Sequence, residues 1–275
     1  MAQGGFLDGG LTIQPLGTRA IAPNTLEMIL FHSFVLVVVG LAFEGRIAST
    51  SRGTTICCRR GDAAAHAMTQ ALDDPSCRGV ISLGIAGGLD HRHPSGTHLV
   101  ASHVIAGNEA IPTHGPWSQT LLKSCTAAVH APIVGRDHVV IDPEEKRELF
   151  TRTGAAAVDT ESHTTAVMAR ERGLPFTCLR IVADPAHRRV PNAAMSGLRE
   201  DGRAYPAGVL RALLRRPHET LALVAIARDT WRARRMLARA VALAGDHLGL
   251  PPPQVSAALL EQIDAGDAIP SPAAE

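Results

Sequence analysis

The residues best suited to chemistry in this chain are carboxylates and glycines that directly follow apolar, strand-like segments. Glu44 follows Phe34–Val39, Asp159 and Glu161 follow an alanine- and valine-rich segment, and Asp184 ends the run FTCLRIVAD. The glycine-rich sequence GIAGG follows a fourth apolar run. Because ligands bind at the carboxyl ends of strands in α/β sheets, we expect these segments to converge on one sheet edge. Carboxylates there suit acid–base chemistry and polyol binding, and glycines let backbone N–H groups approach a ligand.

Each of these features also has an ordinary structural explanation. Asp159 or Glu161 at a helix start complements the helix dipole, and an aspartate before Pro185 is typical of a turn. Glu44 is also compatible with a solvated charge at a helix start. GIAGG lacks the spacing of the dinucleotide-binding and Walker motifs, and its glycines are compatible with a plain tight turn. The functional interpretation therefore depends on all four segments occurring together in this order.

Strand-like and helix-like segments alternate along the chain and would position these residues. The pattern predicts an α/β fold: a single-domain, three-layer αβα sandwich with a mainly parallel, mixed central sheet. The predicted strands are Phe34–Val39, Gly79–Leu83, His98–Ala106, His138–Ile141, Ala155–Asp159 and Phe176–Ala183. The predicted helices are Ala63–Leu72, Gln119–Val129, Pro143–Thr153, Thr160–Arg172, Ala207–Arg215 and His218–Leu248.

The composition bounds the class of protein. The chain has 275 residues, of which 45% are hydrophobic and 19% charged, so a folded core is expected. A formal net charge of +1 and only 3% aromatic residues argue against a nucleic-acid-binding protein. Five irregularly spaced cysteines indicate neither a zinc site nor a disulfide framework. The histidines with the closest spacing lack a ligand pattern, so we expect no metal and no resident cofactor; they are His91, His93, His98 and His103.

The ends of the chain look different from its middle. We predict a flexible leader at residues 1–30, one domain at residues 31–250, and a tail at residues 251–275 that begins with PPP. The apolar stretch Leu26–Phe43 is interrupted by polar residues, and its valine-rich core has the length of a strand. It is therefore interpreted as the first core strand of a cytoplasmic protein, not as a membrane span or a signal peptide.

Three segments between Val37 and Pro185 resemble the nucleoside phosphorylase and nucleosidase superfamily. They read VVVGLAFE, ISLGIAGGL followed by SGTHLVASHVI, and AAAVDTESHTTAVMARERGLPFTCLRIVADP. Within that superfamily, GLAFEGRIA, DTESH, LRIVADPAHRRVP and the arginine-rich C-terminal third look most like the hopanoid-associated phosphorylases. The resemblance implies a nucleoside phosphorylase-like fold. It also implies release of adenine from adenosylhopane, a triterpenoid lipid joined to a nucleoside, to give ribosylhopane or phosphoribosylhopane in hopanoid biosynthesis.

The resemblance also assigns roles to the carboxylates. Asp184 matches the residue that protonates N7 of the departing adenine, for which its pKa must be raised. Glu161 matches the residue that accepts hydrogen bonds from the ribose 2′- and 3′-hydroxyls and stabilises the oxocarbenium-like charge. Glu44 corresponds to the carboxylate that activates water in the nucleosidase branch. Asp159 is expected to support the site without touching the substrate.

Three positions depart from the family pattern. Thr160 stands where many relatives carry a methionine against the ribose. Ala183 replaces a serine that orients the acid in nucleosidases. Val139 lies in the region of the aromatic residue that stacks on the base, so a purine would lie between aliphatic side chains and lose part of the stacking energy.

The nucleophile is left open at this point. Glu44 acting as a base would make the reaction a hydrolysis. If Arg46, Arg180 or another basic group holds phosphate near Gly84, phosphate is the co-substrate and the reaction is a phosphorolysis. In either case the backbone of the glycine-rich segment would line the base or the phosphate, through Ala86, Gly87 and Gly88.

An arginine-rich helical region follows Pro206 and contains Leu, Val and Ala between its basic residues. Such a region is compatible with a packed helix carrying solvated arginines, and also with peripheral contact at the inner, anionic face of a membrane, which we predict together with the lipidic substrate. Two other functions are considered: a soluble nucleosidase for methylthioadenosine-like nucleosides, and a non-catalytic nucleoside- or lipid-binding protein. The resemblance further implies a homo-oligomer.

Overall fold

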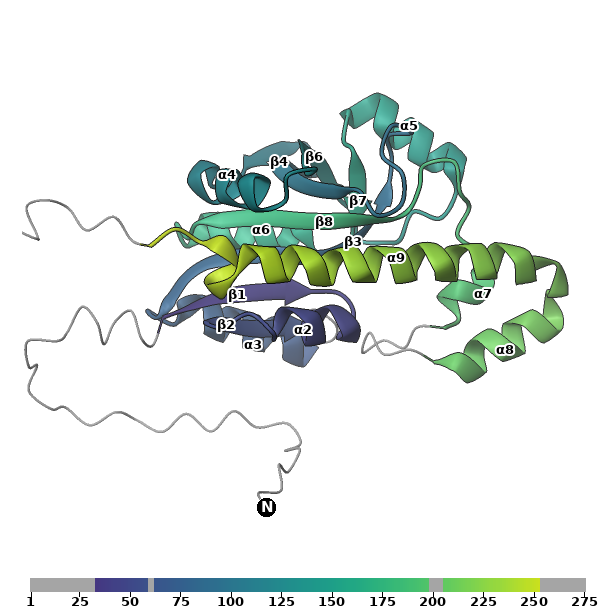
Figure 1. Ribbon diagram of the computed structural model, residues 1–275, viewed down its shortest axis with the longest axis horizontal. Helices are drawn as coiled ribbons and strands as arrows, with labels where there is room; N and C mark the ends of the chain where they lie inside the picture. The colour runs from purple at the N-terminus through teal and green to yellow at the C-terminus, as the bar shows by residue number, and fades with distance from the viewer. Residues whose placement is uncertain (1–32, 59–61, 198–204, 253–275) are drawn as a thin grey trace, which may run out of the picture. The chain divides into compact units, whose positions relative to one another are not determined.

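Eight strands form one mixed sheet in the part of the chain that the structure, a computed structural model, describes: residues 33–58, 62–197 and 205–252 (Figure 1). The predicted leader, residues 1–30, and nearly all of the predicted tail lie outside these residues. The strand order is β2-β1-β3-β7-β6-β4-β5, and β8 pairs with both β3 and β4. The strands are β1 Phe34–Val39, β2 Thr54–Cys58, β3 Cys77–Gly88, β4 His98–Ala106, β5 Glu109–Pro112, β6 Val129–Gly135, β7 Ala157–Asp159 and β8 Phe176–Asp184.

The central strands β1, β3 and β8 run parallel to one another, so their carboxyl ends lie at the same edge of the sheet. β1 pairs with β3 only as far as Ser82, whereas β3 continues to Gly88 beside β8. The end of β1 is therefore set back from the ends of its neighbours. This step in the sheet edge leaves room for the loop and helix that follow β1.

Helices cover both faces of the sheet, which confirms the predicted α/β class. One face carries α2 (Ala42–Ala48), α4 (Gly115–Ser124) and α9 (Thr220–Ala244), with α9 lying along β8 (Figure 1). The other face carries α3 (Asp62–Asp73) and α6 (Ser162–Glu171). A third, smaller cluster packs α5 (Pro143–Thr153) against β6 and β7.

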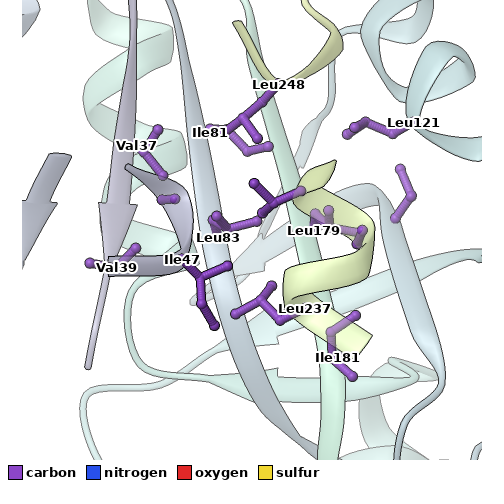
Figure 2. Packing of buried hydrophobic residues seen from close by; sticks show 14 of the residues in the cluster. Val37, Val39, Ile47, Ile81, Leu83, Leu121, Leu179, Ile181, Leu237 and Leu248 are labelled. Atoms are coloured by element: carbon purple, nitrogen blue, oxygen red, sulfur yellow. The ribbon is translucent and has the colours of Figure 1, made fainter. Parts of the chain in front are cut away.

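Alternating residues of the parallel strands enter the two cores, as strand geometry requires. Val37, Ile81 and Leu179 enter the core beneath α9, where they are wholly buried together with Leu237 of that helix (Figure 2). The neighbouring residue on each strand points to the opposite face; Val80, next to Ile81 on β3, enters the other core. Strands buried on both faces explain the continuous runs of valine, isoleucine and leucine in the sequence.

The predicted strand Gly79–Leu83 is too short. It forms the middle of β3, which extends from Cys77 to Gly88. The predicted glycine-rich turn after it is therefore wrong, because β8 pairs with β3 as far as Gly87, with one shift of register between Ala86 and Gly87. Backbone hydrogen bonds from a neighbouring strand keep this glycine-rich segment extended.

Other predicted boundaries are also wrong. His138–Ile141 is not a strand, and the strand of this region is β6, which lies earlier in the chain. The predicted helix Gln119–Val129 is displaced from α4, which begins after His114 with a proline in its first turn. A proline suits that position because its missing N–H is not needed there. The elements β2, β5 and α2 were not predicted.

The C-terminal third adds helices beyond the sheet. They are α7 (Asn192–Met195), α8 (Pro206–Arg215), the 3-10 turn η1 (Pro217–Glu219), α9 and the 3-10 turn η2 (Asp246–Gly249). Figure 1 shows α7 and α8 beside the N-terminal end of α9, and η1 joins α8 to α9. Among the described residues, no helix has both the length and the apolar character that a membrane span requires.

Candidate active site

Glu44 lies at the step in the sheet edge, held by the backbone of two strands' ends. Glu44 belongs to α2, and its side chain turns back toward the start of that helix. Its Oε2 accepts hydrogen bonds from the N–H groups of Gly40 at 3.0 Å and Leu41 at 2.8 Å. Oε1 accepts a third, from the N–H of Ile85 on β3, at 2.8 Å. The side chain is almost completely buried. These bonds fix the carboxylate between the end of β1 and the carboxyl-terminal part of β3.

The pKa of Glu44 indicates that this carboxylate can take part in proton transfer. Burial raises the pKa from its ordinary value to about 7; the guanidinium of Arg180 opposes this rise, and the carboxylate of Glu161 adds to it. A carboxylate with a pKa near neutral pH exchanges a proton readily under physiological conditions, which is what a general base requires.

Arg180 joins the remaining charges of this region. The arginine, from β8, is wholly buried, and its Nη2 lies 2.5 Å from Asp159 Oδ2 and 3.3 Å from Glu161 Oε2. The same nitrogen donates to Ser82 Oγ at 2.6 Å. Asp159 uses its other oxygen to accept hydrogen bonds from the backbone N–H and hydroxyl of Ser162, at 3.1 and 2.6 Å, at the start of α6. Asp159 therefore supports Arg180 and the helix start.

Two glycines allow the charged side chains to come together. A Cβ atom on Gly40 would overlap the carboxylate of Glu161. A Cβ atom on Gly84 would overlap both the carboxylate of Glu44 and the guanidinium of Arg180. Glu161, at the N-cap of α6, and Glu44, on α2, therefore reach the same place at the sheet edge from segments more than one hundred residues apart.

Asp184 lies further along β8 and has a cationic partner. The ammonium group of Lys146, on α5, forms a short ion pair with Asp184 Oδ2 and also donates to the carbonyl oxygens of Arg188 at 3.1 Å and Pro185 at 3.5 Å. Lys146 is completely buried, and the side chain of Asp184 is 15% exposed. Burial raises the pKa of Asp184, and the charge of Lys146 opposes that rise. Asp184 is thus a buried carboxyl whose charge is balanced by one lysine.

Sequence reasoning missed Lys146. It lies in the highly charged segment PEEKREL, where a lysine is ordinarily solvated. The available signal was its helical spacing, since Lys146 precedes Leu149 by three residues and both are the buried residues of α5. A lysine on the buried face of a helix requires a charged or polar partner, and that partner is Asp184.

The glycine-rich segment meets Asp184 inside the sheet. Gly87 pairs with Asp184 in the register of β3 and β8, and a Cβ atom on Gly87 would lie 3.3 Å from Asp184 Oδ2. Gly87 and Gly88 also pair with β7. Ala86 packs in the core beneath α6. These residues belong to a strand that is paired on both sides, and they do not form the loop that was expected to offer backbone N–H groups to a ligand.

The three positions that depart from the family pattern lie in different surroundings. The hydroxyl of Thr160 donates a short hydrogen bond to Glu161 Oε1, so this residue helps to orient that carboxylate. Ala183 packs in the core beneath α9. Val139 lies in the loop between β6 and α5 and is 41% exposed.

The site thus has two parts along β8. Arg180, near Glu44 and Glu161, is four residues from Asp184, which corresponds to about 13 Å of extended strand. The first part holds two buried carboxylates beside Arg180, and the second part holds one carboxyl paired with a lysine. Within the residues that the structure describes, no group of three or more His, Cys, Asp or Glu side chains is placed to hold a metal ion.

The fold is shared with enzymes of known structure. Futalosine hydrolase of Helicobacter pylori matches with a TM-score of 0.54 and 14% identity, over 78% of this chain and 99% of that one. The 5′-methylthioadenosine/S-adenosylhomocysteine nucleosidase of Colwellia psychrerythraea, solved with adenine, matches with a TM-score of 0.54 and 14% identity, over 77% and 96%. The Helicobacter pylori nucleosidase of the same name matches with a TM-score of 0.53 and 16% identity, over 77% and 98%. A comparison with curated protein sequences gives no match.

The fold and the family match identify an α/β enzyme of the kind that cleaves N-glycosidic bonds, as the resemblance in the sequence implied. The chain belongs to the phosphorylase superfamily, whose model matches residues 16–215. The match includes both parts of the candidate site.

Proposed function

We propose that this protein cleaves the N-glycosidic bond of a purine nucleoside with water as the nucleophile, and that adenine is the base released. The observation that carries the proposal is the meeting of Glu44 and Glu161 at one point of the sheet edge, with Asp184 further along the same strand. Three carboxyl groups in this arrangement supply the base, the sugar ligand and the acid that the reaction needs.

Glu44 is proposed to accept the proton of the attacking water. Its carboxylate is held in place by three backbone N–H groups and therefore does not need to reorganise during the reaction. With a pKa of about 7, it takes up a proton at physiological pH more readily than an ordinary glutamate does.

Glu161 is proposed to accept hydrogen bonds from the ribose hydroxyls. Thr160 and Arg180 both contact its carboxylate and orient it. As the bond from C1′ to the base nitrogen breaks, positive charge develops on the ribose, and the negative charge of Glu161 stabilises that charge. The electron pair of the broken bond goes to the purine.

Asp184 is proposed to give a proton to N7 of the purine as that electron pair arrives. Its burial favours the protonated form, whereas Lys146 favours the carboxylate. The protonated carboxyl can therefore donate its proton, and the carboxylate that remains is stabilised by its ion pair with the Lys146 ammonium group. The products are the free purine and a sugar with a hydroxyl group on C1′.

Water is favoured over phosphate by the charges around Glu44. Arg180 is buried there, and its Nη2 contacts Asp159, Glu161 and Ser82, so its positive charge is already balanced by two carboxylates. A phosphate in this place would meet two carboxylates, and like charges at short range repel. The solved relatives described above are called hydrolases or nucleosidases, which is consistent with water.

The finer proposal is that the nucleoside is adenosylhopane and that ribosylhopane is the product. It is supported by the sequence resemblance of GLAFEGRIA, DTESH and LRIVADPAHRRVP to the hopanoid-associated phosphorylases. The nucleosidase structures favour a second candidate, a small nucleoside of the methylthioadenosine type.

One experiment tests both levels of the proposal. The full chain is incubated with adenosylhopane or with methylthioadenosine, with and without phosphate, and the released adenine and the mass of the sugar product are measured. We expect adenine release without phosphate and an unphosphorylated sugar, with adenosylhopane the better substrate by kcat/KM. A phosphorylated sugar that forms only with phosphate would exclude hydrolysis, and binding without turnover would identify a non-catalytic protein.

A further inference from the structure

The segment from α8 to the middle of α9 exposes large apolar side chains that the sheet does not use. None of the residues of α8 is buried. Five apolar side chains of the two helices are between 58% and 84% exposed: Leu210, Leu214, Leu221, Val224 and Trp231. Side chains of this size are ordinarily buried or distributed singly, and a local concentration of them indicates a contact surface.

The same segment carries a large excess of positive charge. Between Pro206 and Arg235 it has seven arginines, and all of them are exposed: Arg211, Arg215, Arg216, Arg228, Arg232, Arg234 and Arg235. Its two acidic residues already have partners. Glu219 accepts a hydrogen bond from the backbone of Ala193, and Asp229 pairs with Arg188. The charge presented to a partner is therefore strongly basic.

Apolar and basic side chains share the same helix faces. On α9, Leu221, Val224, Arg228, Trp231 and Arg235 follow one another at intervals of three or four residues, which places them in one stripe. The guanidinium of Arg235 lies 4.7 Å from the centre of the Trp231 ring. We call this stripe, together with the exposed residues of α8, the basic apolar face.

On α8 the pattern is the same. Leu210 and Leu214 lie one turn apart, and each is followed directly by an arginine, Arg211 and Arg215. Next to them lies an open, apolar hollow of about 380 Å³, lined by Gly197, Tyr205, Pro206, Val209, Leu210 and Leu213. A long arginine can keep its head group at a polar surface while its neighbouring leucine enters an apolar layer.

We propose that the basic apolar face docks the protein on the surface of an anionic lipid bilayer. Leucine and tryptophan side chains would enter the boundary between head groups and acyl chains, and the arginines would contact the lipid phosphates. A second copy of the chain fits less well, because a twofold contact through this face would bring arginines against arginines. The inference depends on this exposed surface alone and not on the proposed reaction.

Vesicle binding by the 275-residue chain tests the inference. Co-sedimentation is measured with vesicles of phosphatidylcholine alone and of phosphatidylcholine mixed with phosphatidylglycerol. We expect binding to the anionic vesicles only, and weaker binding at high salt because the arginine contacts are screened. The double variant Arg211→Glu, Arg215→Glu should bind at least about 30-fold more weakly, the effect of removing two basic residues from an anionic membrane surface.

Matched variants separate docking from general effects of charge and of apolar exposure. Leu214→Ser with Leu221→Ser should weaken binding about tenfold or more. Leu243→Ser, at the other end of α9 where the side chain is 50% exposed, should leave binding unchanged. Arg152→Glu, an exposed change on α5 outside the basic apolar face, is the control for charge and should bind the vesicles as the parent chain does. All variants should keep the circular dichroism spectrum and the rate of adenine release of the parent chain. The inference is overturned by equal binding to both vesicle types, by unchanged binding of the variants, or by a dimer in gel filtration that the same variants dissociate.

Discussion

The ammonium group of Lys146, at the buried face of α5, is paired with the carboxylate of Asp184 at the end of β8. The pair joins a helix on one side of the sheet to the strand that carries the proposed acid. A lysine next to a general acid stabilises the acid's conjugate base, and burial has the opposite effect on the same carboxyl. The proton-donating ability of Asp184 therefore results from two opposed influences that mutation can separate.

Asp184→Asn removes the acid and keeps the shape of the side chain. An amide cannot give up a proton to N7, so we expect adenine release to fall by about 10²–10⁴-fold, the typical contribution of general acid catalysis. The measurement is steady-state adenine release, with Asp73→Asn, an exposed carboxylate on α3, as the control. Normal turnover by Asp184→Asn would show that another group protonates the purine.

Lys146→Met removes the positive charge and replaces it with an uncharged side chain of similar length. Because Lys146 lowers the pKa of Asp184, its loss should extend the protonated form of Asp184 to higher pH. The descending, alkaline limb of the kcat/KM profile should then move to higher pH, while Lys146→Arg, which keeps the charge, should move it much less. A profile with the same alkaline limb in Lys146→Met would mean that the pair has only a structural role.

The acid limb of the same profile should report Glu44. This residue must be ionised to accept a proton, and its pKa is about 7, so kcat/KM should rise as the pH increases through that value. Glu44→Gln should lower adenine release by about 10²–10⁴-fold and abolish this rise. Glu148→Gln, an exposed change on α5, serves as the control and should keep both the rate and the rise. An unchanged acid limb in Glu44→Gln would assign it to another group.

The position of the carboxylates at one sheet edge could be predicted because it follows from local patterns. The runs that form β1 and β8 are apolar and β-branched; Asp184 ends the second run, and Glu44 follows the end of the first by five residues. Parallel strands with buried faces leave little freedom in where their carboxyl ends lie. The strands Phe34–Val39 and His98–Ala106 and the helix Pro143–Thr153 were predicted with the bounds that the structure shows.

The contacts that define the environment of each carboxylate could not be predicted in this way. Gly84–Gly88 has the composition of a turn, yet the pairing with β8 keeps it in β3, and that pairing joins segments almost one hundred residues apart. The ion pair between Lys146 and Asp184 and the contact of Arg180 with Glu161 are also long-range. Helical spacing can show that Lys146 is buried, but the partner of each such group depends on the packed fold and has no signature within a short sequence window.

Glu161→Gln should affect both binding and chemistry. The amide keeps one acceptor for the ribose hydroxyls but loses the negative charge that stabilises the developing cation. We expect kcat/KM to fall about tenfold to hundredfold, the effect of losing a hydrogen bond to a charged group, with both a higher KM and a lower kcat. Steady-state kinetics with the preferred nucleoside provide the measurement. A change in kcat alone, with KM unaltered, would argue against contact with the sugar in the ground state.

Arg180→Met should destabilise the fold in a way that depends on pH. Arg180 is wholly buried between Asp159 and Glu161, and its removal leaves two buried carboxylates without their cation. Breaking a buried ion pair from one side costs about 3–5 kcal/mol of the free energy of unfolding. Arg180 also lowers the pKa of the buried Glu44, so its loss raises that pKa further. The folded variant then holds a proton on Glu44 to higher pH than the parent does, and the deficit in its free energy of unfolding should shrink as the pH falls. Urea denaturation at neutral and mildly acidic pH measures the difference. A deficit of the same size at both pH values would mean that lost packing, and not unpaired charge, is the cause.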